Sequence, residues 1–425
     1  MKEKIRAQRG TKDILPNEEY KWNFLKKVFE STAKSYNFKI IKTPVFEATE
    51  LFNRSVGETT DIVQKEMYTF KDKGGRSLTL RPEGTAGVVR AILEHGLCNF
   101  MLPLKVYYLD TFYRYEKPQS GRYREFFQFG CELFGSNLSE ADAEVMHFAF
   151  KILDELSLAN YIELKVNSVG CSRCKKKYFH ALHEYFELKK SALCQMCLER
   201  LQKNPARILD CKSQQCENIS LNAPITLDYL CNECYQHFES VKDKLKNLKL
   251  KYTVDPKIVR GLDYYTRTVF ELVDNSLGAQ KTVCGGGRYD NLVKEMGGRD
   301  LPALGFGLGV NRLLLALENH NIKIKKDDNL DLYIINVQED LRSCAVVFCR
   351  VLRENFISCE CDLLGRSLKA QLKYADRICA RFVLVLGSEE LEKKEADLKN
   401  LKTREIKKIS LKKYEFATQI IKILK

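Results

Sequence analysis

A hairpin between residues 105 and 135 constrains the fold of this chain more than any other stretch. Two strand-like segments flank a polar loop at residues 117–125, so the second segment returns antiparallel to the first. Successive side chains of a strand point to opposite faces, which places Gln128 and Glu132 on one face and Phe129 on the other. The hairpin therefore predicts an antiparallel sheet with one packed face and one polar face turned toward an open site.

The hairpin also carries charge in a regular order. Arg114 and Glu116 follow the first segment, and Arg122 and Arg124 lie in the loop. A solvated, charged loop is one interpretation of this pattern. Guanidinium groups spaced in this way favour another, in which they converge on phosphate or carboxylate, because the planar fork of arginine matches these groups.

A second distinctive stretch covers residues 257–270. Gly261 frees the backbone just after Arg260, and the last five residues, 266–270, are mostly good strand formers. Tyr264 and Tyr265 are adjacent, so in a strand they would face opposite ways and at least one would line a cavity. The alternative is a surface turn followed by an ordinary strand.

Two glycine-rich segments follow. Residues 285–287 are three consecutive glycines, which suit either a hairpin turn or a close approach of the backbone to a small substrate. Glycines at 305, 307 and 309 leave one strand face bare, where a flat adenine ring could lie. Their spacing differs from the dinucleotide-binding pattern.

Glu83 and Thr85 stand in a Pro-Glu-Gly turn between a strand at residues 77–80 and a helix at about 86–94. A carboxylate before a helix commonly caps its first N–H groups. The alternative is that Glu83 faces a substrate ammonium group and Thr85 supplies a second polar contact.

Half of the 16 cysteines lie between residues 171 and 234, in four closely spaced pairs: Cys171 and Cys174, Cys194 and Cys197, Cys211 and Cys216, Cys231 and Cys234. Without a secretory signal, metal binding is favoured over disulfides. Two structural zinc sites of four thiolates are possible, paired in tandem or interleaved, and eight buried or loose thiols are the alternative. Nearby basic side chains are expected to form a basic surface: Lys175, Lys176, Lys177, Lys189, Lys190 and Arg200.

Composition limits the class of protein. The 425 residues suffice for two or three domains, and the net charge of +14 favours a polyanionic partner without distinguishing RNA from DNA or membrane. No apolar run reaches ~18 residues, and the N-terminus lacks a secretory core, so we expect a cytoplasmic protein with no membrane span. After a polar link at residues 320–329, alternating strands and helices predict a compact α/β domain with a mixed sheet.

The segments 260–271 and 285–290 resemble the two signatures of histidyl-tRNA synthetases, which are class II aminoacyl-tRNA synthetases. The helix and strand near residues 22–46 resemble motif 1, the hairpin motif 2, residues 302–315 motif 3, and residues 365–376 the anticodon-binding domain of related synthetases. The resemblance implies an α+β chain. Its catalytic domain, on a class II antiparallel sheet, would comprise residues 1–166 and 241–325, with a helical Cys-rich insertion at 167–240 and an α/β anticodon-binding domain at 330–425.

The same resemblance implies residue roles. Arg260 and Arg114 would be catalytic, beside the α-phosphate of ATP, and Arg114 would also contact the carboxylate of the amino acid. Glu132 would accept a hydrogen bond from the imidazole as one of the histidine-binding side chains: Glu83, Thr85, Gln128, Glu132, Tyr264, Tyr265 and Tyr289. ATP would be bound by Arg114, Glu116, Arg122 and Arg312. The family usually has an acidic residue where Asn311 stands, so Mg²⁺ would be held mainly by the phosphates of ATP.

The implied activity is the joining of histidine to ATP as histidyl-adenylate, followed by transfer to the 3′ end of histidine tRNA, in a homodimer. Two other classes stay open. A regulatory paralogue would bind histidine without charging tRNA, but it would lack the anticodon domain and key arginines. A tRNA-sensing or structural module would show no histidine-dependent exchange of pyrophosphate with ATP.

Overall fold

The computed structural model describes residues 4–57, 60–211, 213–258, 260–278, 280–326 and 330–424. The chain has two compact units, Met1–Ile324 and Lys325–Lys425. Among the described residues, the structure contains no helix that is both long and apolar enough to cross a membrane.

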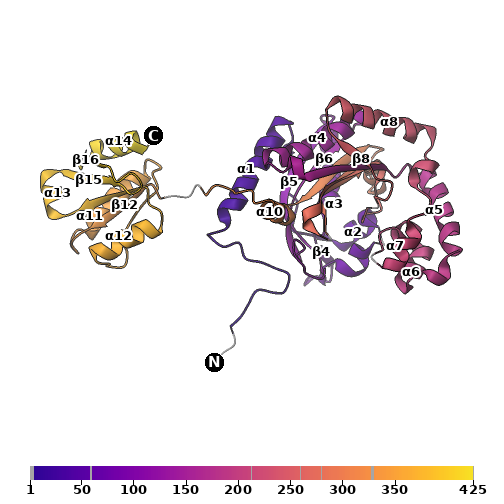
Figure 1. Ribbon diagram of the computed structural model, residues 1–425, viewed down its shortest axis with the longest axis horizontal. Coiled ribbons are helices and arrows are strands. Elements are labelled where there is room, and N and C mark those ends of the chain that lie inside the picture. The colour runs from indigo at the N-terminus through magenta and orange to yellow at the C-terminus, as the bar shows by residue number, and fades with distance from the viewer. Residues whose placement is uncertain are drawn as a thin grey trace. The chain divides into compact units, whose positions relative to one another are not determined.

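An eight-stranded sheet forms the centre of the first unit (Figure 1). Its strands lie in the order β1 (Lys39–Ile40), β5 (Leu104–Tyr113), β6 (Glu125–Phe134), β11 (Ala303–Gly309), β10 (Thr282–Arg288), β9 (Thr266–Asp274), β7 (Ile162–Ser168) and β8 (Tyr252–Val254). Neighbouring strands pair antiparallel except at the two edges, where β1–β5 and β7–β8 are parallel. The antiparallel centre confirms the fold class expected from the hairpin.

The hairpin itself is β5 and β6, paired from Leu104 opposite Phe134 to Tyr113 opposite Glu125. Phe129 and Cys131 are completely buried in the main core. This core lies between the sheet and helices α1 (Glu19–Ser35), α4 (Ser139–Glu155) and α8 (Asn232–Asn247), as the side chains of Leu25, Phe148 and Val241 show. The predicted alternation along β6 is therefore confirmed.

The opposite face of the sheet is covered by helix α3 (Thr85–Glu94) and by the loop that precedes β9. Tyr264 and Tyr265 lie in this loop rather than in the strand, so the expectation that they face opposite ways was wrong. Their ring centroids are 4.8 Å apart. The three consecutive glycines form the middle of β10, between β9 and β11, so they are not a hairpin turn.

The cysteine-rich insertion is built from helices α5 (Ser172–Glu187), α6 (Gln195–Lys203), α7 (Gln214–Ser220) and α8. Helices α5, α6 and α7 gather beside the sheet, while α8 runs back over α4 (Figure 1). Elsewhere in this unit, helix α2 (Thr49–Val56) and a small sheet in the order β2 (Phe46–Ala48), β4 (Ser77–Leu80), β3 (Thr69–Lys71) precede α3.

The second unit has a mixed sheet, as predicted. Strands β13 (Cys359–Cys361), β12 (Leu332–Asn336) and β14 (Phe382–Leu386) are parallel, and β15 (Glu395–Asn400) and β16 (Ile406–Ser410) continue the sheet antiparallel. Its helices are α11 (Arg342–Arg353), α12 (Leu368–Arg377), α13 (Ser388–Lys393) and α14 (Lys413–Leu424). The sequence prediction did not include β15, β16 and α13.

Candidate functional site

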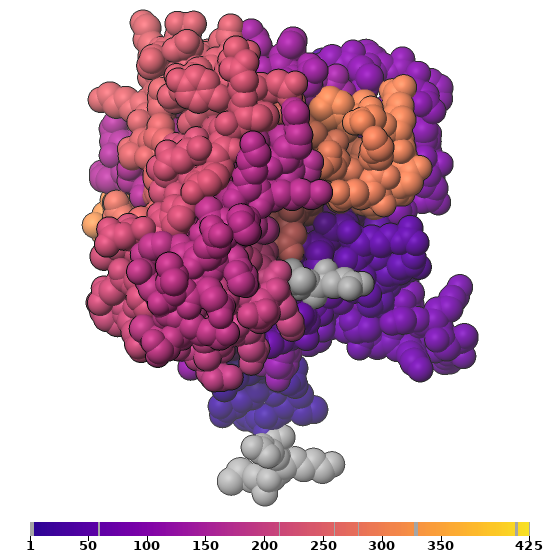
Figure 2. Space-filling model, turned by 90° about the vertical axis from the view of Figure 1, so that its right-hand side faces the viewer, coloured from indigo at the N-terminus to yellow at the C-terminus, as the bar shows by residue number. Residues whose placement is uncertain are grey.

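One cavity of about 820 Å³ collects all the side chains that the sequence predicted for histidine and ATP. Its floor is the central sheet, and its walls come from three distant parts of the chain. These parts meet on the face shown in Figure 2, where the insertion is magenta to salmon, the N-terminal part purple and the residues near 300 orange. The predicted residues lining the cavity are Glu83, Thr85, Arg114, Glu116, Arg122, Gln128, Glu132, Arg260, Tyr264, Tyr265, Tyr289 and Arg312.

A buried hydroxyl cluster surrounds Glu132 at one end of the cavity. Its carboxyl group accepts hydrogen bonds from Thr85 Oγ1 at 2.8 Å, Tyr289 OH at 2.5 Å and Tyr108 OH at 3.4 Å. Tyr264 OH lies 3.4 Å from Thr85 Oγ1. Burial raises the pKa of Glu132 to about 8, although the bonds from Tyr289 and Thr85 act against the shift. Glu132 is therefore neutral near pH 7 and can both donate and accept a hydrogen bond.

Glu83 does what the simpler interpretation of its turn predicted. Its two carboxylate oxygens accept the backbone N–H groups of Thr85 and Ala86, each at 2.7 Å, and so cap helix α3. The same side chain lines the cavity and is fully buried, and burial raises its pKa. The position of Glu83 is thus compatible both with capping helix α3 and with facing a substrate ammonium group.

Four guanidinium groups lie around the other end of the cavity. Arg114 Nε donates to Pro82 O at 2.8 Å, and Arg260 pairs with Glu271. Arg312 donates to Thr282 O at 2.8 Å and to Gly121 O at 3.3 Å. Burial, with Arg122 and Arg114 close by, lowers the pKa of Arg312 to about 10. Cations that destabilise one another in this way suit a ligand with several negative charges.

Two of the glycines in β11 make room for site residues. A side chain at Gly305 would collide with the Glu132 carboxylate, and one at Gly307 would collide with the Gln128 amide. The bare strand face is thus covered by β6 side chains that lie across it. The sequence indicated a face without side chains of its own, but Glu132 and Gln128 occupy this face at positions 305 and 307.

Glu271 and Tyr108 belong to the site but were missed by the sequence prediction. Glu271 pairs with Arg260 and accepts a 2.9 Å hydrogen bond from Thr282 Oγ1. Its signal was a carboxylate between apolar neighbours in strand β9, with Val269 and Phe270 before it and Leu272 and Val273 after it. Tyr108 gave no such signal, because a tyrosine in a buried strand is ordinary.

Asn311 also has a fixed role. Its side-chain oxygen accepts the backbone N–H of Phe127 at 2.9 Å, which ties helix α10 (Val310–Asn319) to strand β6. The amide is therefore engaged in holding the site together.

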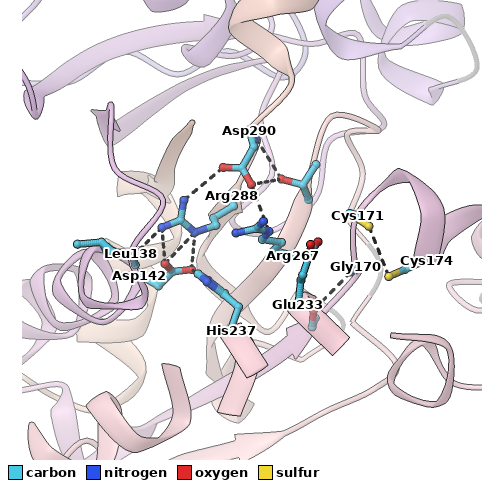
Figure 3. Close-up of polar contacts among 12 residues, drawn as sticks. Leu138, Asp142, Gly170, Cys171, Cys174, Glu233, His237, Arg267, Arg288 and Asp290 are labelled. Atoms are coloured by element: carbon cyan, nitrogen blue, oxygen red, sulfur yellow. Dashed lines mark hydrogen bonds and ion pairs between the residues drawn. The ribbon is translucent and has the colours of Figure 1, made fainter. Parts of the chain in front are cut away.

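Behind the site, Arg288 is fully buried and forms a network with Asp142 (Figure 3). Arg288 Nε donates to both carboxylate oxygens of Asp142 at 2.9 and 2.8 Å, and its other nitrogens reach Asp290 and the Leu138 carbonyl. Burial alone would raise the pKa of Asp142, but Arg288 and His237 hold it below its ordinary value. This network links β10 to α4 and α8 and fixes the strand that precedes Tyr289.

The eight insertion cysteines form two clusters whose members are nested along the chain. One cluster is Cys171, Cys174, Cys231 and Cys234, and the other is Cys194, Cys197, Cys211 and Cys216; within each, the four Sγ atoms lie within 4.8 Å of one another. The sequence suggested tandem or interleaved pairing, and the nested order is neither. The first and last pairs meet because the chain enters and leaves the insertion at the same place.

The sulfur distances fit a tetrahedral ion. Cys171 and Cys174 Sγ are 3.6 Å apart, Cys171 and Cys231 Sγ 3.9 Å, and Cys194 and Cys211 Sγ 3.8 Å. A disulfide requires about 2.05 Å. Four thiolates at ~2.3 Å from a zinc ion form a tetrahedron with edges of about 3.8 Å. Each cluster therefore has the geometry of one four-thiolate site.

Only some of the basic side chains expected on the surface of the insertion are exposed. Lys175 is turned inward, where its ammonium group donates to backbone carbonyls of the catalytic domain. Arg200 is also partly buried and lies 3.5 Å from Asp61. Lys176, Lys177 and Lys190 are exposed, and Lys189 is half-buried.

Family comparisons bear on the whole chain. The family model described as histidyl-tRNA synthetase matches residues 10–313, and the model described as anticodon binding domain matches residues 331–420. The histidine–tRNA ligase of Caldanaerobacter subterraneus subsp. tengcongensis is 48% identical over 412 residues, covering 97% of this chain and 99% of the relative. That of Acetivibrio thermocellus is 49% identical over 405 residues, covering 95% and 97%.

Solved structures with a similar fold include a protein of the same description. The apo histidyl-tRNA synthetase of S. aureus superposes with a TM-score of 0.83 at 39% identity, covering 99% of this chain and all of the other. A Bacillus halodurans protein described as an ATP phosphoribosyltransferase regulatory subunit/histidyl-tRNA synthetase shares the fold, with a TM-score of 0.59 at 22% identity, over 87% of this chain and 96% of that one.

Proposed function

The chain belongs to the histidyl-tRNA synthetase family, and on that premise we propose how its residues divide the work of charging histidine tRNA. The activity is that of an aminoacyl-tRNA ligase. A carboxylate oxygen of histidine attacks the α-phosphorus of ATP, the bond to the β-phosphate oxygen breaks, and pyrophosphate leaves. A terminal ribose hydroxyl of the tRNA then attacks the carbonyl carbon of histidyl-adenylate, and AMP leaves.

The first step uses the arginine end of the cavity. Arg260 and Arg114 stabilise the negative charge that develops on the α-phosphate, and Arg114 also orients the attacking carboxylate. Glu116, Arg122 and Arg312 position ATP. Mg²⁺ is carried mainly by the phosphates, because the Asn311 oxygen is engaged with the Phe127 N–H. The observation that supports this assignment is the convergence of four guanidinium groups on one cavity.

The hydroxyl cluster selects histidine. Glu132 accepts a hydrogen bond from one imidazole nitrogen, while Tyr264 and Gln128 contact the ring and Glu83 and Thr85 hold the ammonium group. Tyr289 keeps the Glu132 carboxyl in place through a 2.5 Å hydrogen bond from its hydroxyl group. The Tyr265 ring supports Arg260, whose Cζ lies 5.4 Å from the ring centroid. A site that hydrogen-bonds its substrate rejects analogues that lack the partner group.

Exchange of labelled pyrophosphate into ATP tests these roles. We expect histidine-dependent exchange by the wild type and its loss in Arg260→His, while the same change at the exposed Arg299 should leave it intact. No exchange by the wild type would exclude activation of histidine. Equal exchange by both variants would remove Arg260 from the mechanism.

A regulatory role without charging is the second candidate, because the Bacillus halodurans protein shares the fold. Two observations favour the enzyme. The anticodon-binding family model covers residues 331–420 of this chain, and Arg114 and Arg260 line the same cavity. Because the reaction needs tRNA and ATP, the proposed location is the cytoplasm.

Each cysteine cluster is proposed to hold one structural Zn²⁺. A closed four-thiolate site leaves no position for substrate, so its contribution is to the folding of the insertion. Metal analysis should find two zinc ions per chain, one fewer in Cys174→Ser or in Cys216→Ser, and an unchanged number in Cys379→Ser, whose thiol is exposed. A chain purified without metal that keeps its insertion folded would contradict this proposal.

The homodimer is proposed from exposed apolar side chains in the stretch that resembles motif 1 and just before β5. The exposed fractions are 52% for Phe46, 84% for Phe100 and 73% for Met101. An interface of standard size buries about 1,600 Å² and would cover such side chains. Sedimentation should report a dimer that Phe46→Asp weakens and that Phe356→Asp, a fully exposed position in the second unit, does not.

A further inference from the structure

Lys175 lies in the insertion but contacts the catalytic domain. It follows the metal-cluster residue Cys174 on helix α5, and its Nζ donates to the backbone oxygens of Tyr265 at 2.5 Å and Asp263 at 3.3 Å. These carbonyls belong to the loop of residues 260–265, named here the Arg260 loop. An ammonium group buried on two carbonyl oxygens holds the backbone that carries Tyr264 and Arg260.

The backbone beside Lys175 holds the end of the same loop. We name residues 169–175 the neck of the insertion. Val169 N donates to Arg267 O at 2.8 Å, and Arg267 N donates to Gly170 O at 2.9 Å. Arg267 has a φ of +46°, a left-handed conformation that residues other than glycine seldom adopt. Such strain persists where the surroundings fix it, and here the neck supplies both hydrogen bonds.

A second contact comes from the chain between Cys197 and Cys211. Arg207 Nη2 donates to Gly261 O at 3.2 Å and to Asp263 Oδ1 at 3.1 Å. Asn204 Nδ2 lies 3.4 Å from the same Asp263 oxygen. The insertion therefore contacts the Arg260 loop through two segments, one beside each thiolate cluster.

The space between the insertion and the loop is not fully packed. A cavity of about 340 Å³ lies there, lined by Tyr178, Phe179 and Ala206 of the insertion, by Leu262 of the loop and by Ile258 just before it. Dense packing normally fixes a loop through many dispersion contacts. Because part of that packing is missing, the polar contacts of Lys175 and Arg207 carry more of the positioning.

We propose that Lys175 is a positioning residue for histidine activation. Resting on the proposed function, this inference gives the insertion a role in the first chemical step, before any tRNA binds. Lys175 holds the carbonyls of Asp263 and Tyr265 so that Tyr264 faces the Glu132 cluster and Arg260 faces the phosphate end of the cavity. The backbone of the neck helps to set the position of Lys175, because Lys175 N donates to the Cys171 carbonyl oxygen at 2.9 Å.

The test compares Lys175→Met with Lys176→Met. Both changes remove one positive charge from adjacent positions of α5, but Lys176 is exposed. Without tRNA, Lys175→Met should raise the KM for histidine in pyrophosphate exchange about tenfold, the equivalent of about 1.4 kcal/mol, and lower kcat. Calorimetric titration with histidine should show the same loss of affinity. Zinc content and the KM for tRNA should match those of Lys176→Met.

Arg207→Lys provides a second variant if Lys175→Met folds poorly, since it keeps the charge but loses the forked contact to Gly261 and Asp263. An increased histidine KM in either folded variant supports the inference. It is overturned if both folded variants match Lys176→Met in histidine affinity. Absence of exchange by the wild type would instead refute the proposed function, so the two failures are distinguishable.

Discussion

Replacing Glu132 by glutamine should remove a pH-dependent destabilisation of the folded protein. The Glu132 carboxyl is 1% exposed and lies among the hydroxyl groups of Thr85, Tyr108 and Tyr289. Glutamine has nearly the same shape but stays neutral at every pH. The hydroxyl groups can reorient to serve its amide, because each can donate or accept.

The magnitude follows from the pKa. Below pH 4.5 the group is protonated in the folded and the unfolded chain, so it contributes nothing. Between pH 4.5 and about 8 the unfolded chain ionises while the folded chain keeps its proton, and stability falls as pH rises. At about 1.36 kcal/mol per pKa unit, the loss is about 3 kcal/mol at pH 7 and levels off at about 5 kcal/mol above pH 8.

Thermal and urea unfolding of the histidine-free protein between pH 5 and 9 measures this effect. The wild type should lose stability relative to Glu132→Gln as pH rises, and the difference should level off above pH 8. Glu199→Gln, an exposed change on α6, controls for the altered charge. Histidine binding should weaken about two- to tenfold in Glu132→Gln, since a hydrogen bond between neutral groups is worth about 0.5–1.5 kcal/mol. Parallel pH profiles of wild type and Glu132→Gln would refute the assignment of a neutral carboxyl.

Three further outcomes can be measured. Asp142→Asn should destabilise the first unit by about 3–5 kcal/mol in urea unfolding, because the buried Arg288 charge loses its buried carboxylate and keeps only the ion pair with Asp290; the exposed Asp154→Asn should not. Gly286→Ala should lower the melting temperature or abolish soluble expression, because its Cβ would strike the Gly305 carbonyl and lie 2.7 Å from Phe306 Cβ, whereas Gly74→Ala has room. Treating the wild type with a chelator to remove metal should weaken histidine binding, as measured by calorimetric titration. An unchanged affinity would show that the metal sites do not help to position the Arg260 loop.

Local sequence patterns were sufficient where the physical cause is local. Alternation along β6 placed Glu132 in the site and Phe129 in the core, because the period of a strand leaves no other choice once one face is buried. Spaced glycines in β11 indicated a face without side chains of its own, but not that Glu132 and Gln128 of β6 lie across it. In the second unit the parallel strands and their helices followed from alternating apolar segments, while the polar antiparallel pair β15–β16 gave a weaker signal.

Sequence patterns failed where partners distant in the chain decide the outcome. Spacing left tandem and interleaved pairings open, yet Cys171 meets Cys231, 60 positions away. A run of lysines indicated a surface, yet Lys175 is half-buried and its ammonium group donates to carbonyls that no local pattern reveals. Arg288 lies in the glycine-rich signature at residues 285–290, but its complete burial depends on Asp142 of helix α4, which is distant in the sequence.

The nested cysteines have a consequence for the order of assembly during synthesis. The inner cluster is complete once residue 216 has left the ribosome, whereas the outer cluster must wait for residue 234 and close a loop of about 60 residues. Closing so long a loop carries an entropic penalty, which an already compact inner lobe reduces. Under the proposed zinc assignment, metal binding to the outer cluster would bring the growing chain back to β7, which is synthesised earlier, as β8 and β9 emerge to pair with it.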